Sequence, residues 1–104
     1  MLLSTTYTIH GKKIVKHLGL VRGNTIRARH IGNDILASLR NIVGGEITDY
    51  TKMMAESREQ SIDRMIEEAQ KLGANAIIGV RFSTTEIMQR AAEIMVFGTA
   101  VVVE

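Results

Sequence analysis

The spacing of apolar residues divides this 104-residue chain into extended and helical segments. Leu2–Thr8 and Ile14–Val21 mix β-branched, aliphatic and aromatic residues, which predicts two strands. Arg22–Thr25 contains a glycine and an asparagine, which tolerate positive φ angles, and this predicts a turn or bulge. Thr25–Arg29 is then expected to continue as extended chain.

A short amphipathic helix is predicted next. Isoleucine, leucine and valine recur at steps of three and four residues over Gly32–Val43. Gly44-Gly45 ends this pattern, as residues that readily turn left-handed commonly end helices.

A longer helix follows, with Thr48 or Asp49 as its N-cap and Lys71 with Gly73 as its C-terminal signature. One stripe of residues at helical spacing runs along it. The stripe consists of Tyr50, Met54, Ser57, Ser61, Met65, Ala69 and Leu72. Its middle is built from small residues, so we expect another backbone to approach the helix closely there.

Ala76–Thr85 and Glu93–Val103 are predicted as the last two strands, joined by a connection over residues 86–91. Both faces of the last strand are apolar, whereas a strand with one wet face alternates with polar residues. One long helix covers only one face of a small sheet, so something else must cover the other. A second subunit is the economical candidate, and the shorter helix is the alternative.

These elements predict an α+β fold with two layers, an antiparallel sheet packed on one long helix plus a shorter helix. The length favours a single domain over residues 1–104. The absence of cysteine excludes disulfides, thiolate nucleophiles and cysteine-ligated metal sites. No stretch has the pattern of a secretory signal or a membrane span, so we expect a soluble, cytoplasmic protein.

The formal net charge of +2 hides a division along the chain. The first 30 residues carry no acidic group. They hold the basic residues Lys12, Lys13, Lys16, Arg22, Arg27 and Arg29, and all three histidines. The other 74 residues hold 7 basic and all 11 acidic groups, which makes them net acidic. The two parts are therefore expected to form complementary surfaces.

Several short segments, taken in order, resemble the YbjQ-like family of small bacterial and archaeal proteins. The resemblance is carried by Ser4-Thr5-Thr6, Asp34, Leu39-Arg40-Asn41-Ile42-Val43-Gly44-Gly45, Tyr50, Gly73-Ala74-Asn75-Ala76-Ile77-Ile78-Gly79-Val80 and Gly98-Thr99-Ala100-Val101. It covers essentially the whole chain. It implies a dodecin-like subunit with an antiparallel sheet against a long helix, and a ring of five subunits joined by extra short strands.

The family is often labelled heavy-metal-binding, so the resemblance also implies a divalent or heavy-metal ion as a cofactor. It supplies no enzyme activity. Relatives commonly place aspartates in the strand after Gly79-Val80, where this chain has Arg81 and Ser83 and only Glu86 is acidic. His30 stands where relatives often have asparagine. These departures weaken the case for a cation site in that strand.

The histidines His10, His17 and His30 are the candidate metal ligands, because imidazole binds zinc, copper and nickel. Their spacing matches no short metal-binding motif, so ordinary surface histidines are the alternative. The six methionines are scattered over the predicted elements, which favours a packing role over a copper site.

The basic residues 12–29 are the candidate polyanion-binding or nucleic-acid-binding residues, since a ring would multiply their positive charge. Tyr7 is the one aromatic residue near them in the sequence, so no base-stacking platform is expected. An intersubunit salt-bridge surface is the alternative use of these charges. Ser57 and Ser61 have no activating histidine or aspartate at local spacing, and no other catalytic motif is present.

We therefore expect a non-enzymatic, homo-oligomeric binding or scaffold protein, with the chain itself as its first partner and a pentamer as its assembly. Polyanion binding is the alternative function, and an enzyme with sites between subunits is the second alternative.

Overall fold

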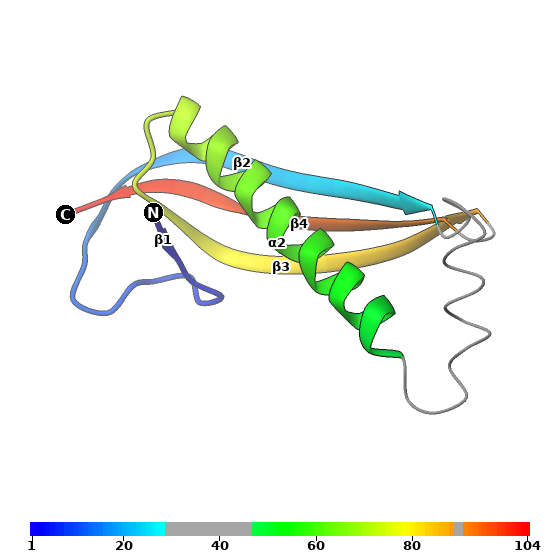
Figure 1. Ribbon diagram of the computed structural model, residues 1–104. Helices are drawn as coiled ribbons and strands as arrows, with labels where there is room; N and C mark the ends of the chain where they lie inside the picture. The colour runs from blue at the N-terminus through cyan, green and yellow to red at the C-terminus, as the bar shows by residue number, and fades with distance from the viewer. Residues whose placement is uncertain (29–46, 89–90) are drawn as a thin grey trace.

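The structure is a computed structural model. It describes the main chain of residues 1–28, 47–88 and 91–104, and the side chains of residues 1–26, 52–86 and 92–104. Four strands and one helix are assigned in these ranges (Figure 1). They are β1 (Leu2–Leu3), β2 (Ile14–Ala28), α2 (Ile47–Lys71), β3 (Ala76–Met88) and β4 (Ala91–Val103).

The four strands form one sheet in the order β1-β3-β4-β2. β4 pairs antiparallel with both β2 and β3, as the sequence predicts. β1 pairs parallel with β3, so the sheet is mixed and the prediction of a purely antiparallel sheet is wrong at this edge. The α+β class and the packing of the sheet on one long helix are confirmed.

β1 is much shorter than the predicted strand Leu2–Thr8. The hydroxyl groups that follow it bind within their own segment. The Thr6 main-chain N–H donates to Ser4 Oγ at 3.1 Å, and Thr6 Oγ1 donates to the Thr8 carbonyl at 2.6 Å. Local bonds of this kind compete with regular strand pairing. Main-chain bonds to β3 nevertheless continue past Leu3, since the Ser4 N–H donates to the Ile77 carbonyl and the Gly79 N–H donates to the Thr6 carbonyl, both at 2.9 Å.

β2 runs through Arg22–Thr25 with regular pairing, so the predicted turn or bulge there is wrong. Gly23 and Asn24 pair with Val96 and Met95 of β4. The irregularities lie earlier, between Ile14 and Lys16 and between His17 and Gly19. Each irregularity adds one residue to β2, so the first reverses the faces of the side chains that follow it and the second restores them from Gly19 onward.

α2 begins one residue before Thr48, the earlier of the two predicted N-caps, and ends at the predicted Lys71. Gly73 follows with a positive φ of 85°, which confirms the C-terminal signature. Ser57, Ser61, Met65 and Ala69 of the predicted stripe are fully buried. Leu72 lies beyond the helix end and is 45% exposed, so its assignment to the stripe is wrong.

Two other predicted features lie at the limits of the described residues. The shorter helix over Gly32–Val43 lies outside them. The connection between the last two strands is shorter than predicted, because β3 extends to Met88 and β4 begins at Ala91.

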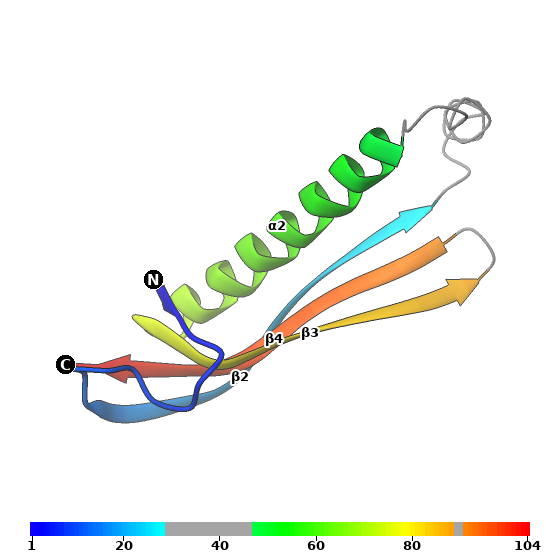
Figure 2. The same ribbon diagram turned by 90° about the horizontal axis from the view of Figure 1, so that it is seen from below.

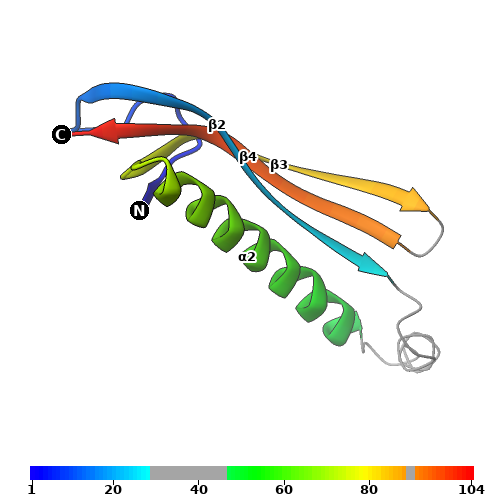
Figure 3. The same ribbon diagram turned by 90° about the horizontal axis from the view of Figure 1, so that it is seen from above.

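α2 lies along one face of the twisted sheet, and among the described segments the N-terminal one passes over part of the other face (Figures 2 and 3). The helix side holds the larger core, which consists of Val21, Met65, Ala69, Ile77, Val80, Val96 and Ala100. On the opposite side, Ile9 and Ile14 pack against a second cluster of Ala76, Ile78, Val101 and Val103. The chain therefore covers one end of its second sheet face itself.

Candidate binding surface

The rest of the second sheet face carries a row of three side chains on three neighbouring strands. Phe97 of β4 is in register with Arg22 of β2 and with Arg81 of β3. Their neighbours Val21, Val80 and Val96 are buried in the core on the helix side. Because side chains alternate along a strand, Arg22, Phe97 and Arg81 point away from α2. Both arginines are exposed and Phe97 is partly exposed.

Tyr7 extends this row beyond β3. The Arg81 guanidinium carbon lies 5.8 Å from the centre of the Tyr7 ring, within the range of a cation–π contact. Arg81 also donates from Nη1 to the carbonyls of Thr5 at 2.7 Å and Val80 at 2.8 Å. These bonds fix the guanidinium beside the N-terminal segment, while the Tyr7 side chain stays 71% exposed. Aromatic and cationic groups thus alternate across this face.

The structure places two of the three candidate metal ligands. His10 lies in the turn before β2 and His17 lies in β2, and both are exposed. His30 lies outside the described residues. Within the described ranges, no group of three or more histidine, cysteine, aspartate or glutamate side chains is placed to hold a metal ion. The described part of the chain thus offers His10 and His17 as exposed single candidates.

The described basic residues of the first third all remain at the surface. Lys12, Lys13, Lys16 and Arg22 are exposed. Arg27 belongs to β2 by its main chain, and Arg29 lies outside the described residues. Lys13 is tied to the chain end, because its N–H and carbonyl exchange hydrogen bonds of 3.0 and 2.9 Å with the main chain of Glu104. The lysines therefore gather where β2 begins and β4 ends.

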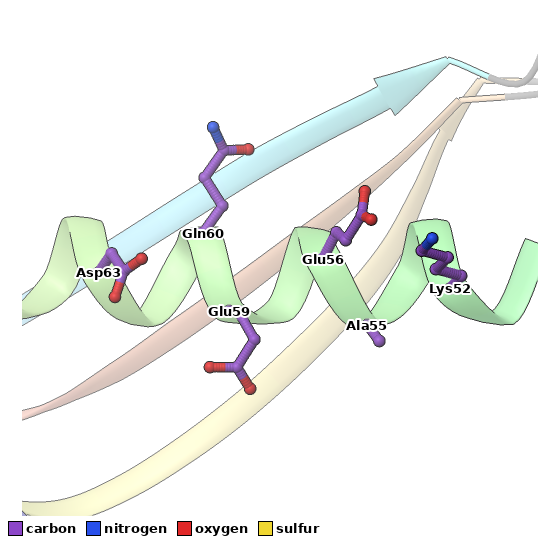
Figure 4. A pocket seen from close by; sticks show the side chains of 6 residues that line it. All are labelled: Lys52, Ala55, Glu56, Glu59, Gln60 and Asp63. Carbon is purple, nitrogen blue, oxygen red and sulfur yellow. The ribbon is translucent and has the colours of Figure 1, made fainter.

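A shallow groove of about 500 Å³ lies on the outer side of α2 (Figure 4). Its lining residues are Lys52, Ala55, Glu56, Glu59, Gln60 and Asp63. All six come from successive turns of the one helix. The described lining contains three carboxylates and no histidine or cysteine. The groove is therefore an acidic helix surface. Its described lining does not bring a nucleophile and a general base together, as a catalytic site would.

The serines of α2 are structural. Ser57 Oγ donates to the Met53 carbonyl at 2.9 Å. Ser61 Oγ lies 2.9 Å from the Ser57 carbonyl and 3.2 Å from the Ile94 carbonyl, and it pairs with Thr25 Oγ1 at 2.9 Å. Both serines are fully buried. The Ser61 hydroxyl joins the helix to β2 and β4, and neither serine hydroxyl is accessible to a substrate.

The fold and this surface define a small α+β protein with an open, partly cationic sheet face. The chain belongs to the YbjQ family described as "Putative heavy-metal-binding", whose profile matches residues 1–104. The resemblance of the sequence motifs is thereby confirmed. No helix among the described residues is long and apolar enough to span a membrane.

Relatives occur in bacteria and archaea. A UPF0145 protein of Dehalococcoides mccartyi is 62% identical over 104 residues, which is 100% of both chains. A UPF0145 protein of Methanosarcina acetivorans is 54% identical over 97% of this chain and 95% of its own. A crystal structure from Pediococcus pentosaceus, a protein of unknown function in the DUF74 family, matches with a TM-score of 0.66. It covers 100% of this chain and 98% of its own at 16% identity, and so it supports the fold.

Phe97 was not predicted from the sequence as a surface residue. Phe97 is 75 positions from Arg22 and 16 from Arg81, and only the strand order brings the three side chains together. Val96 and Phe97 are consecutive in a strand and so face opposite sides of the sheet. Because β4 is apolar on both faces, the sequence pattern predicts that both residues are buried. The one hint of this surface in the sequence was Arg81, a charged residue that follows the apolar residues at the start of β3.

Proposed function

We propose that this chain is a non-enzymatic scaffold subunit that assembles edge to edge, in the cytoplasm, into a homo-oligomeric ring of five. The observation that carries this proposal is the free edge of β2, a 15-residue strand that ends the described sheet. A long unpaired edge offers main-chain groups to another strand. Two side chains of this strand, Leu20 and Ile26, are 65% and 62% exposed.

The opposite side of the sheet offers a matching edge. β1 pairs with only two residues of β3, so β3 has no described neighbour on its outer side from Arg81 onward. Leu2, Leu3 and Phe82 on this side are each at least 40% exposed. Two different edges that join head to tail generate a ring when the rotation closes. The five-fold number comes from the family resemblance.

The experiment is a mass measurement by light scattering coupled to size exclusion. We expect about five subunits of 11.5 kDa for the native chain. Ile26→Lys adds a charge at the exposed edge and should lower the mass towards that of one subunit. Gln70→Lys adds the same charge on the exposed side of α2 and serves as the control. A native chain that elutes as a monomer contradicts the proposal.

Polyanion binding is the second candidate function. It is favoured by the exposure of Lys12, Lys13, Lys16 and Arg22, which leaves their charges open to phosphate groups. A heparin-binding assay tests it with the triple variant Lys12→Ala/Lys13→Ala/Lys16→Ala. Affinity should fall in the variant and should decrease steeply with salt for the native chain. A flat salt response excludes this function.

Metal binding is proposed only for the assembly. The family description favours it, and the described residues of one subunit do not supply a complete ligand set. Exposed His10 and His17 are the residues that neighbouring subunits would bring together.

A further inference from the structure

We propose that the row Tyr7–Arg81–Phe97–Arg22 is a binding site for single-stranded nucleic acid. This inference rests on the second candidate function, polyanion binding, and it specifies both the ligand and the place where it lies. The row crosses β3, β4 and β2 on the face that α2 leaves open. Its members come from four separate parts of the chain.

The chemistry of the row matches the two repeating parts of a nucleic acid strand. Guanidinium groups pair with phosphates in a bidentate way, and aromatic rings stack on bases of any sequence. Neighbouring strands are about 4.8 Å apart, so Arg22 and Arg81 flank Phe97 at roughly that spacing. The Tyr7 ring follows at 5.8 Å from Arg81. Each aromatic ring therefore lies beside a cation.

The row differs from the rest of the sheet face in its positive charge. The row holds two arginines and no acidic residue. The nearest described acid of β4 on the same face is Glu93, four residues before Phe97, and its carboxylate accepts a hydrogen bond from Asn24 Nδ2 at 3.1 Å. Arg22 and Arg81 therefore have no described acidic residue beside them in the row. An anionic ligand is therefore favoured here.

The form of the surface selects a single strand over a duplex. In a duplex the base faces are stacked and out of reach, and the grooves are read by elements that enter them. The aromatic groups here lie on the face of a sheet, where they reach only bases that are already unstacked. Phe97 and Tyr7 would have no stacking partner on duplex DNA.

The test is fluorescence anisotropy with a short labelled oligo(dT) and the full chain at low salt, with an unlabelled duplex of equal length and heparin as competitors. Phe97→Leu keeps an apolar side chain without an aromatic face and should weaken oligo(dT) binding about tenfold. Tyr7→Leu should weaken it similarly, whereas the matched control Tyr7→Phe should not. Arg22→Ala and Arg81→Ala should each reduce the slope of log affinity against log salt by about 0.7.

Each outcome has a distinct meaning. If Phe97→Leu loses oligo(dT) binding and retains heparin binding, the proposal is supported. If both ligands bind Phe97→Leu as they bind the native chain, polyanion binding stands and the stacking site is wrong. If Phe97→Leu instead lowers the mass of the assembly, another copy of the chain covers this face and the proposal is overturned. If the native chain binds neither ligand, polyanion binding fails as well. Circular dichroism confirms that each variant is folded.

Discussion

The main chain of Gly23 in β2 lies directly against Ser61 of α2. A Cβ atom on residue 23 would be 2.0 Å from the Ser61 carbonyl oxygen and 2.6 Å from the Met65 nitrogen. Both atoms belong to the helix backbone, so neither can move aside without displacing α2. The small residues in the middle of the helix stripe are therefore matched by a glycine in the strand they contact.

Gly23→Ala should destabilise the protein by about 2 kcal/mol, because the added methyl group forces α2 away from the sheet. Chemical denaturation with urea measures this change. Gly11→Ala is a useful comparison. No described atom lies within 4 Å of its added Cβ, but its φ of 76° is left-handed, so the cost there is about 1 kcal/mol from backbone strain. Equal effects at the two positions would contradict the close-packing explanation.

Ser61 and Thr25 should behave as a coupled pair. The single hydroxyl proton of Ser61 goes to a carbonyl oxygen, so Thr25 Oγ1 donates to Ser61 Oγ across the 2.9 Å contact. Thr25 is 3% exposed, and Ser61→Ala leaves its donor buried without this partner. We expect a loss of about 1–3 kcal/mol.

The double variant Ser61→Ala/Thr25→Val tests this coupling, because it removes both polar groups together. It should be less destabilised than the sum of the two single variants. Equilibrium unfolding of all four proteins gives the coupling free energy. A sum that is strictly additive would show that the hydroxyl pair contributes nothing beyond its separate parts.

Asn75 explains part of the Gly73–Val80 motif in structural terms. Its side chain imitates a strand partner, since Nδ2 donates to the Val103 carbonyl at 2.9 Å and Oδ1 accepts from the Val103 N–H at 2.8 Å. Asn75→Ala should cost about 1 kcal/mol and should remove the hydrogen-exchange protection of the Val103 amide. Asn24→Ala, which loses only a surface contact to Glu93, should leave that amide protected.

The helix and strands were predicted from the sequence more accurately than the packing and register between them. The stripe of α2 was correct from Ser57 to Ala69 because helical periodicity is a local property that burial reinforces. Gly23 was assigned to a turn or bulge, because a glycine needed for close packing and one needed for a turn look the same in a sequence. The bulge between His17 and Gly19 gave no signal of its own.

The candidate surface was predictable only in part. The exposure of Lys12, Lys13 and Lys16 follows from their charge. The position of Phe97 between the two arginines depends on the register of three strands. A local sequence pattern holds no information about that register. The apolar character of both faces of β4 was interpreted as a need for a partner, yet Ile9 and Ile14 of the same chain cover one end. Long-range contacts of this kind decide which apolar residues remain exposed.

Zinc binding should follow assembly. In the proposed assembly, the metal site forms where neighbouring copies bring their histidines together, and the described residues of one subunit contain no group of three ligands. Isothermal titration with zinc should give saturable heat for the native chain, and the heat should be lost in His10→Ala/His17→Ala/His30→Ala. It should also be lost in Ile26→Lys if that variant is monomeric, although all three histidines are retained. The Gln70→Lys control should bind zinc as the native chain does. Heat that persists in a monomeric variant would place the complete ligand set within one subunit.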